Sequence, residues 1–121
     1  MKKDKSILIT GGAGFLGSHI VDLFVRKNFK VTAIDNLSST TNSAYVNPKA
    51  EFIEMDINDK NLKKIIRNLN TKIILHAASQ ISVSNSSKYP TKDAKNNIIG
   101  SLNILESITD FQKCYFIFIS S

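Results

Sequence analysis

Three glycines lie at regular spacing where a short apolar run gives way to a helical pattern. Gly11, Gly14 and Gly17 follow the β-prone run 6–10, and apolar residues then recur at helical intervals up to Lys27. In a strand–turn–helix unit the first glycine permits a tight turn and the second lets a pyrophosphate approach the backbone. The third lets the helix lie close to the sheet. Because the first helical turn also offers amides and the positive end of a dipole, the segment predicts a dinucleotide-binding loop.

An acidic residue, Asp35, closes the next apolar run, 30–34. In a doubly wound sheet this strand end lies beside the glycine loop, and a carboxylate there accepts hydrogen bonds from both ribose hydroxyls of an adenosine. The same charge would repel a 2′-phosphate, so Asp35 favours NAD over NADP as the cofactor, and Asn36 would extend the contact. The alternative is an ordinary surface acid at a strand end.

The elements that must position these residues alternate between β-prone runs and helical patterns. Strands are expected at 6–10, 30–34, 51–54, 72–76 and 115–119, and helices at 15–27, 61–69 and 93–108. The alternation, and strands that are apolar on both faces, predict an α/β fold: a Rossmann-type doubly wound parallel sheet of about five strands in the order 3-2-1-4-5. Asp59 is placed to cap the second helix, and residues 37–50 are expected to form a polar loop, with or without a short helix.

Composition excludes several other classes of protein. The net charge of +6 is spread over scattered lysines without interleaved aromatics, so no nucleic-acid partner is expected. No apolar stretch is long enough to span a membrane, and a cytoplasmic location is expected. Cys114 is expected to be a small core residue, His19 to pack on or near a helix surface, and His76 to make a structural hydrogen bond. The spacing of the two histidines predicts no metal site.

Several segments resemble the NAD-dependent epimerase/dehydratase family of extended short-chain dehydrogenases, and together they cover essentially the whole chain. They are TGGAGFLGSH at 10–19, DNLS at 35–38, Asp56-Ile57, His76-Ala77-Ala78 with Gln80, the helix 97–106, and the final strand with Ser120 and Ser121. The stretch from Gln80 to Pro90 looks most like UDP-glucose 4-epimerases. The resemblance implies transient oxidation at sugar C4 by a bound NAD in the full-length parent, with a UDP-hexose as the expected substrate and a homodimer as a possible assembly.

The resemblance also implies a role for each matching residue. Phe15 and Leu16 would donate backbone N–H groups to the pyrophosphate. Asp56 would hold the adenine amino group, and the backbone N–H of Ile57 would bind the adenine ring. The cofactor would be lined, where it turns toward the nicotinamide, by residues that follow the fourth strand: Ala77, Ala78 and Ser79. Asn97, or its neighbour Asn96, would steady the nicotinamide side, and Ser121 would be the catalytic serine.

One part of the family's machinery has no counterpart in these 121 residues. The family uses a Tyr-x-x-x-Lys pair on a helix, and only Tyr45 and Lys49 have that spacing; Pro48 would break the helix that aligns them. The apolar strand 115–119 would also leave an unprotected edge. We therefore expect 1–121 to be an incomplete N-terminal NAD-binding domain that lacks the substrate lobe and is inactive alone. The alternative is the NAD-binding fragment of a nucleotide-sugar dehydratase or another epimerase.

Overall fold

The computed structural model describes residues 5–38, 45–78, 90–91, 95–108 and 113–119. Within these ranges, no helix is both long enough and apolar enough to cross a membrane. The backbone forms alternating strands and helices, as the hydrophobic periodicity predicts.

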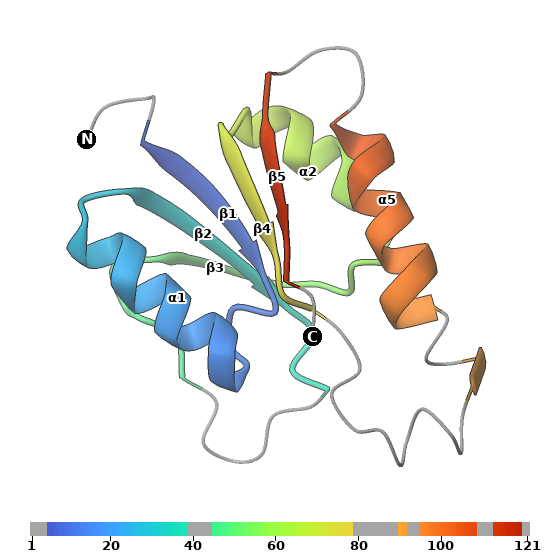
Figure 1. Ribbon diagram of the computed structural model, residues 1–121, viewed down its shortest axis with the longest axis horizontal. Helices are drawn as coiled ribbons and strands as arrows, with labels where there is room; N and C mark the ends of the chain where they lie inside the picture. The colour runs from blue at the N-terminus through green and yellow to red at the C-terminus, as the bar shows by residue number, and fades with distance from the viewer. Residues whose placement is uncertain (1–4, 39–44, 79–89, 92–94, 109–112, 120–121) are drawn as a thin grey trace.

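The described strands form one parallel sheet (Figure 1). They are β1 (Ser6–Thr10), β2 (Lys30–Asp35), β3 (Glu51–Glu54), β4 (Ile73–His76) and β5 (Tyr115–Phe118). Their order is β3-β2-β1-β4-β5, which confirms the predicted order. Because β1 pairs with both β2 and β4, Thr10 stands between Ile34 and His76, and the carboxyl ends of three strands meet at one edge of the sheet.

Helices cover both faces of the sheet (Figure 1). Helix α1 (Phe15–Arg26) lies on one face, and α2 (Leu62–Leu69) and α5 (Gly100–Ser107) lie on the other. A π-helical turn, η1 (Lys95–Ile99), leads directly into α5. The single helix predicted over 93–108 is therefore built from two helical types in its described part.

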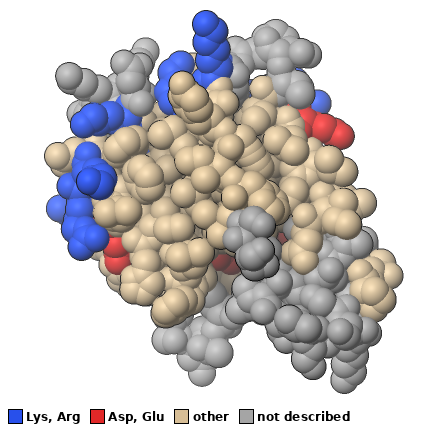
Figure 2. Space-filling model, viewed as in Figure 1, with Lys and Arg blue, Asp and Glu red and all other residues tan. Residues whose placement is uncertain are grey.

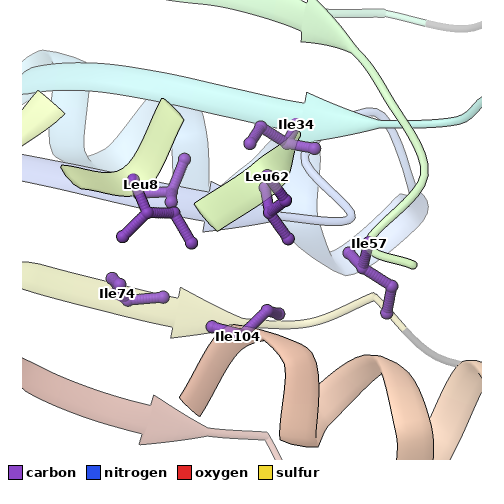
Figure 3. Packing of buried hydrophobic residues seen from close by; sticks show 7 residues of the cluster. Leu8, Ile34, Ile57, Leu62, Ile74 and Ile104 are labelled. Carbon is purple, nitrogen blue, oxygen red and sulfur yellow. The ribbon is translucent and has the colours of Figure 1, made fainter. Parts of the chain in front are cut away.

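Two hydrophobic clusters form the core, one on each face of the sheet. The first lies under α2 and α5 and is shown in Figure 3; it contains Leu8, Ile34, Ile57, Leu62, Ile66, Ile74 and Ile104. The second lies under α1 and contains Ile7, Ile9, Val21, Val31, Ala33 and Leu75. Alternate residues of β1 therefore enter opposite clusters, which explains why the central strands are apolar at every position.

One local expectation differs from the structure and another agrees with it. The carboxylate of Asp59 accepts the N–H of Asn61 at 2.8 Å, yet the N-cap residue of α2 is Asn61, with no side-chain cap bond of its own. The side chain of Asp59 thus closes the turn before the helix, and only its backbone carbonyl accepts from the first helical residue, Leu62, at 3.1 Å. The described part of the expected 37–50 loop, 37–38 and 45–50, contains turns and no helix.

Strand β5 forms one edge of the described sheet and is only partly covered. Its side chains at Tyr115 and Phe118 are exposed, and only Phe116 packs against a core cluster. Figure 2, viewed as Figure 1, shows uncharged residues across the middle of this face and Lys and Arg mainly along its left and top margins. This exposure agrees with the expectation that strand 115–119 leaves an unprotected edge.

Candidate nucleotide-binding site

The glycine loop between β1 and α1 has a geometry that other residues would disturb. Gly11 has a φ of +69°, and a Cβ there would lie 2.8 Å from the backbone nitrogen of Ala78. A Cβ on Gly17 would lie 1.9 Å from the carbonyl oxygen of Gly11, so the helix can approach the loop only with glycine at this position. Among the described residues, a Cβ on Gly14 would meet only the Gly11 oxygen, at 3.3 Å. The space beside Gly14 is thus left to an approaching group.

The first turn of α1 begins at this loop without a cap. Its N-cap residue is Gly14, which makes no side-chain cap bond, and the first turn carries no acidic residue. The first backbone N–H groups of an α-helix have no acceptor within the helix, and the helix dipole makes this end positive. The side chains of Phe15 and Leu16 are exposed and apolar, so they offer no group that would bind an anion. The backbone N–H groups of this first turn are the feature that suits an anion.

The carboxylate of Asp35 lies buried at the end of β2 and is bound to the glycine loop. One oxygen, Oδ2, accepts the N–H of Ala13 at 3.0 Å, and the other, Oδ1, accepts the N–H of Leu37 at 2.8 Å. The loop amides Gly11 and Gly12 also donate to the Ile34 carbonyl, at 2.8 and 3.2 Å. Sequence reasoning missed this bracing role of Asp35. Each carboxylate oxygen retains a second lone pair that could accept a ribose hydroxyl.

Asn36 and Asp56 lie together at the ends of β2 and β3. The amide nitrogen of Asn36 donates to Oδ2 of Asp56 at 3.2 Å, while Oδ1 of Asp56 accepts the backbone N–H of Asn58 at 2.8 Å. Both side chains are exposed, whereas Ile57 is buried in the core and its carbonyl accepts a hydrogen bond from the Asn103 amide. Asn36 and Asp56, both predicted to contact the adenosine, are therefore neighbours, and the buried residue Ile57 anchors the backbone next to Asp56.

The residues after β4 come back to the glycine loop. Ala77 donates its N–H to the Thr10 carbonyl at 3.2 Å, and both Ala77 and Ala78 donate to the Thr10 hydroxyl. Asn97 lies in η1, and its carbonyl accepts the Ser101 hydroxyl at 2.8 Å. Ser79 and Ser121 lie outside the described residues. Sequence reasoning did not single out Thr10 or Ser101 as parts of the site.

The expected structural role of His76 is confirmed. It is buried, it is within hydrogen-bond distance of Thr10 and Ser101, and burial lowers its pKa to about 4. His19 is exposed on α1 and packs edge-on against the Phe15 ring at 5.1 Å. Tyr45 binds Asp22 at 3.2 Å. Cys114 is half-buried beside the first core cluster, as expected for a small packing residue.

The fold and this arrangement define a doubly wound α/β protein with a dinucleotide-type glycine loop. The sequence model described as "NAD dependent epimerase/dehydratase family" matches residues 7–121. The chain belongs to this family, whose cofactor is NAD.

Relatives of known name agree with this assignment. A Methanocaldococcus jannaschii protein provisionally named as a UDP-glucose 4-epimerase is 44% identical over 95% of this chain and 37% of its own length. The UDP-glucose 4-epimerase of Thermotoga maritima, solved with UDP-glucose, superimposes with a TM-score of 0.89 and 41% identity, over 96% of this chain and 38% of that one. A Thermus thermophilus UDP-glucose 4-epimerase, solved with NAD, gives a TM-score of 0.78 and 35% identity, over 84% of this chain and 33% of that one. The chain therefore spans between a third and two fifths of these relatives.

Proposed function

We propose that this chain is the NAD-binding part of a nucleotide-sugar epimerase of the UDP-glucose 4-epimerase type, with a UDP-hexose as the substrate of the whole enzyme. The family match and the relatives named above support this assignment. By the same resemblance, the proposal includes a homodimeric whole enzyme. Residues 1–121 would serve as its cofactor domain, and catalysis would also need residues that these 121 do not include.

The observation that carries the proposal is the bond between the Asp35 carboxylate and Ala13 in the glycine loop. It supports the proposal because it holds the Asp35 carboxylate close to the uncapped start of α1, where the carboxylate would accept the hydroxyls of the adenosine ribose. A dinucleotide needs this pair of features, an anion site for the pyrophosphate and a carboxylate for the neighbouring ribose. Because both are formed by the fold itself, the site is preorganised for a ligand of that shape.

Each predicted residue has a proposed place along the cofactor. The glycine loop and the amides of Phe15 and Leu16 would hold the pyrophosphate. Asp35 and Asn36 would bind the adenosine ribose, and Asp56 and the N–H of Ile57 would bind the adenine. The nicotinamide side would be lined by the residues that follow β4 and by η1: Ala77, Ala78, Ser79 and Asn97. Ser121 would bind the reacting oxygen of the sugar.

The bound cofactor would supply reversible acceptance of a hydride, and this part of the chain would hold and orient it. The exposed carboxylate of Asp56 keeps acceptor capacity besides its bonds to Asn36 and Asn58. The charge of Asp35 would disfavour a 2′-phosphate. These residues therefore determine which nucleotide binds and how it is placed.

Gly14→Ala provides a sharp test of this proposal. The backbone of Gly14 has φ −74° and ψ 175°, which alanine adopts readily, and its new Cβ would meet a single protein atom. If the pyrophosphate lies there, the methyl group should lower NAD affinity by about tenfold or more, because a displaced phosphate loses charge-assisted hydrogen bonds. Isothermal titration calorimetry measures the affinity, and thermal unfolding measures stability.

Two control variants make the result specific. Gly17→Ala should unfold the loop, because its Cβ would overlap the Gly11 carbonyl, so its stability should fall whether or not NAD is present. Ser18→Ala removes only a hydroxyl that donates to the Phe15 carbonyl in the first turn, and it should bind NAD normally. The proposal is wrong if Gly14→Ala binds NAD as tightly as Ser18→Ala, or if the unmodified chain shows no NAD binding.

A further inference from the structure

A chain of buried polar groups joins the ends of β1 and β4 to α5. Thr10, His76 and Ser101 are 0%, 2% and 9% exposed. The hydroxyl oxygen of Thr10 lies 2.6 Å from Nδ1 of His76, and Nε2 of His76 lies 2.9 Å from the hydroxyl oxygen of Ser101. Among the described residues, every buried side-chain nitrogen and oxygen has a hydrogen-bond partner. The positions of the hydrogens can therefore be worked out.

Only one direction of donation satisfies the part of this chain that lies toward α5. The Ser101 hydroxyl donates its single hydrogen to the Asn97 carbonyl at 2.8 Å, since a carbonyl can only accept. Its oxygen must then accept from His76, which places a hydrogen on Nε2. In a neutral ring Nδ1 is then the acceptor, and Thr10 donates to it.

The Thr10 hydroxyl couples this ring to the loop after β4. Its oxygen accepts the N–H groups of Ala77 at 3.1 Å and Ala78 at 3.2 Å. With its own hydrogen given to His76, the oxygen is fully used. A hydrogen on Nδ1 would bring a third donor to an oxygen with two lone pairs and would compete with the two amides. Ala77 also donates to the Thr10 carbonyl, at 3.2 Å, so the amide that depends on the hydroxyl is that of Ala78.

The two ends of this series of hydrogen bonds lie on different parts of the proposed nucleotide site. At one end, the Ala77–Ala78 peptide lies so close to Gly11 that a Cβ there would be 2.8 Å from the Ala78 nitrogen. At the other end, the Asn97 carbonyl belongs to η1. We propose that His76 is a positioning residue: as the neutral Nε2–H tautomer, it holds the Ala77–Ala78 loop and the η1 turn in one arrangement around the nucleotide. The expected effect on NAD binding rests on the proposed function, whereas the direction of hydrogen bonding from Ser101 through His76 to Thr10, here called the proton chain, does not.

The surroundings of the ring agree with a neutral imidazole at pH 7. The rings of Phe116 and Phe118 lie 6.1 and 5.6 Å from it, and burial lowers the pKa of His76. A charged ring would carry hydrogens on both nitrogens and would therefore break the arrangement at Thr10.

Ser101→Ala tests the inference, and Ser107→Ala is its matched control. Both serines are buried on α5, and both donate to the carbonyl four residues earlier, at 2.8 Å for Ser101 and 2.7 Å for Ser107. Only Ser101 contacts His76. The two variants therefore lose the same kind of hydrogen bond, but only Ser101→Ala also interrupts the series of hydrogen bonds through His76.

The first readout is the tautomer of His76, from the nitrogen chemical shifts of the imidazole in the full 121-residue chain. The protein has two histidines, so the spectrum contains one other ring, that of His19. The unmodified chain should show hydrogen on Nε2 at pH 7. A ring with hydrogen on Nδ1, or on both nitrogens, would overturn the inference.

The second readout is hydrogen exchange at the amide of Ala78, which depends on the Thr10 hydroxyl. In Ser101→Ala the Nδ1–H form should increase, and Ala78 should exchange about tenfold faster than in Ser107→Ala, since losing one buried hydrogen bond changes a local opening equilibrium by that order. Thr10→Val should also accelerate this exchange, and Thr10→Ser, which keeps the hydroxyl, should restore it. Equal tautomers and exchange rates in the two serine variants would refute the coupling.

NAD affinity is the third readout, and it separates the two proposals. Ser101→Ala should bind NAD about three- to tenfold more weakly than Ser107→Ala, the range expected for one hydrogen bond. If the unmodified chain does not bind NAD, the proposed function fails while the first two readouts still decide the proton chain. If it binds NAD and Ser101→Ala shifts the tautomer with no change in affinity, the positioning role is wrong and the proposed function stands.

Discussion

At the scale of single residues, Asp35 has one task that the structure shows and a second that we propose. Its carboxylate holds the glycine loop through Ala13 and the following turn through Leu37. The same oxygens face the place proposed for the adenosine ribose. Any substitution of Asp35 will therefore change both the stability of the loop and its affinity for a nucleotide.

Asp35→Ala should weaken NAD binding by about 10- to 100-fold, the range for hydrogen bonds to a charged group. NADP binding should weaken less, because the variant also removes the negative charge that repels a 2′-phosphate. Titration calorimetry with both nucleotides gives the ratio. Asp22→Ala is the control, since Asp22 also accepts two side-chain hydrogen bonds but lies outside the site. An unchanged NAD-to-NADP ratio would remove Asp35 from the ribose contact.

His76 should make the stability of the chain depend on pH. Burial lowers its pKa from 6.5 to about 4, so between these values the unfolded chain binds more protons than the folded chain. The contribution of His76 is thus fully present above pH 6.5 and is lost as the pH falls toward 4. The loss should reach about 3 kcal/mol at most, from 1.36 kcal/mol per pKa unit. Urea midpoints between pH 4 and 7.5 measure it, and His76→Asn should give a flatter profile.

At the scale of elements, α1 has a well-defined C-terminal end. At its C-terminal end, Phe29 donates its N–H to the Phe24 carbonyl and Asn28 donates to the Val25 carbonyl, each at 3.0 Å. Asn28 has a φ of 65°, and the Phe24 and Phe29 rings meet edge to face at 4.9 Å. These features make up a Schellman motif with its hydrophobic contact. The helix therefore ends at a defined point.

Asn28 offers a test of that ending. Asn28→Gly should raise the free energy of unfolding by up to about 1 kcal/mol, because glycine adopts positive φ without steric cost. Asn28→Ala should lower it by a similar amount. Urea denaturation of the three proteins gives the order Gly, Asn, Ala. If the alanine variant is as stable as the glycine variant, the left-handed conformation at Asn28 carries no cost and the explanation fails.

At the scale of the whole molecule, the two edges of the described sheet differ in character. The β3 edge carries Glu51 and Glu54, both exposed, whereas β5 presents Tyr115 and Phe118. An apolar edge with unpaired backbone groups is a template for pairing with another chain. The chain studied by itself should therefore associate through β5.

Tyr115→Lys should reduce this association. Tyr115 is 78% exposed, so the lysine should change the free energy of unfolding by no more than about 0.5 kcal/mol while adding charge to the edge. Sedimentation velocity at several concentrations measures the association. Tyr45→Lys, at another tyrosine that is 49% exposed, adds the same charge away from the sheet and should leave it unchanged. Equal sedimentation of both variants would contradict the role of β5.

Much of the fold followed from local patterns in the sequence. Strands β1 and β4 lie where apolar runs predict them, because a strand buried on both faces needs apolar residues along its length. Strand β3 also lies where it is predicted, although Glu51 and Glu54 at its ends are exposed. The role of Gly17 was also predictable, because a glycine at that spacing lets the helix lie close to the loop and the sheet. The π-helical turn at η1 was missed because it has no hydrophobic period that separates it from an α-helix.

The contacts that complete the site were harder to predict. Thr10 and His76 are 66 residues apart in the chain, and His76 and Ser101 are 25 apart, so no local spacing connects them. The bond from Ala13 to Asp35 depends on a loop conformation that the glycine spacing suggests but does not specify. The predicted roles of Ser79 and Ser121 concern residues outside the described ranges and stay predictions.

The position of β1 between β2 and β4 has a consequence for how the chain folds. A compact unit of β1, α1 and β2 can form from the first 35 residues, yet the other side of β1 is completed only when β4 arrives. Pairing across so long a stretch of chain pays its loop-closure entropy late, which makes it slow. During refolding, helical signal should therefore recover before nucleotide binding does. On the ribosome, likewise, the proposed site at the ends of β1, β2 and β4 cannot form until residue 76 has emerged, so a nucleotide would bind only chains in which β4 has already joined the sheet.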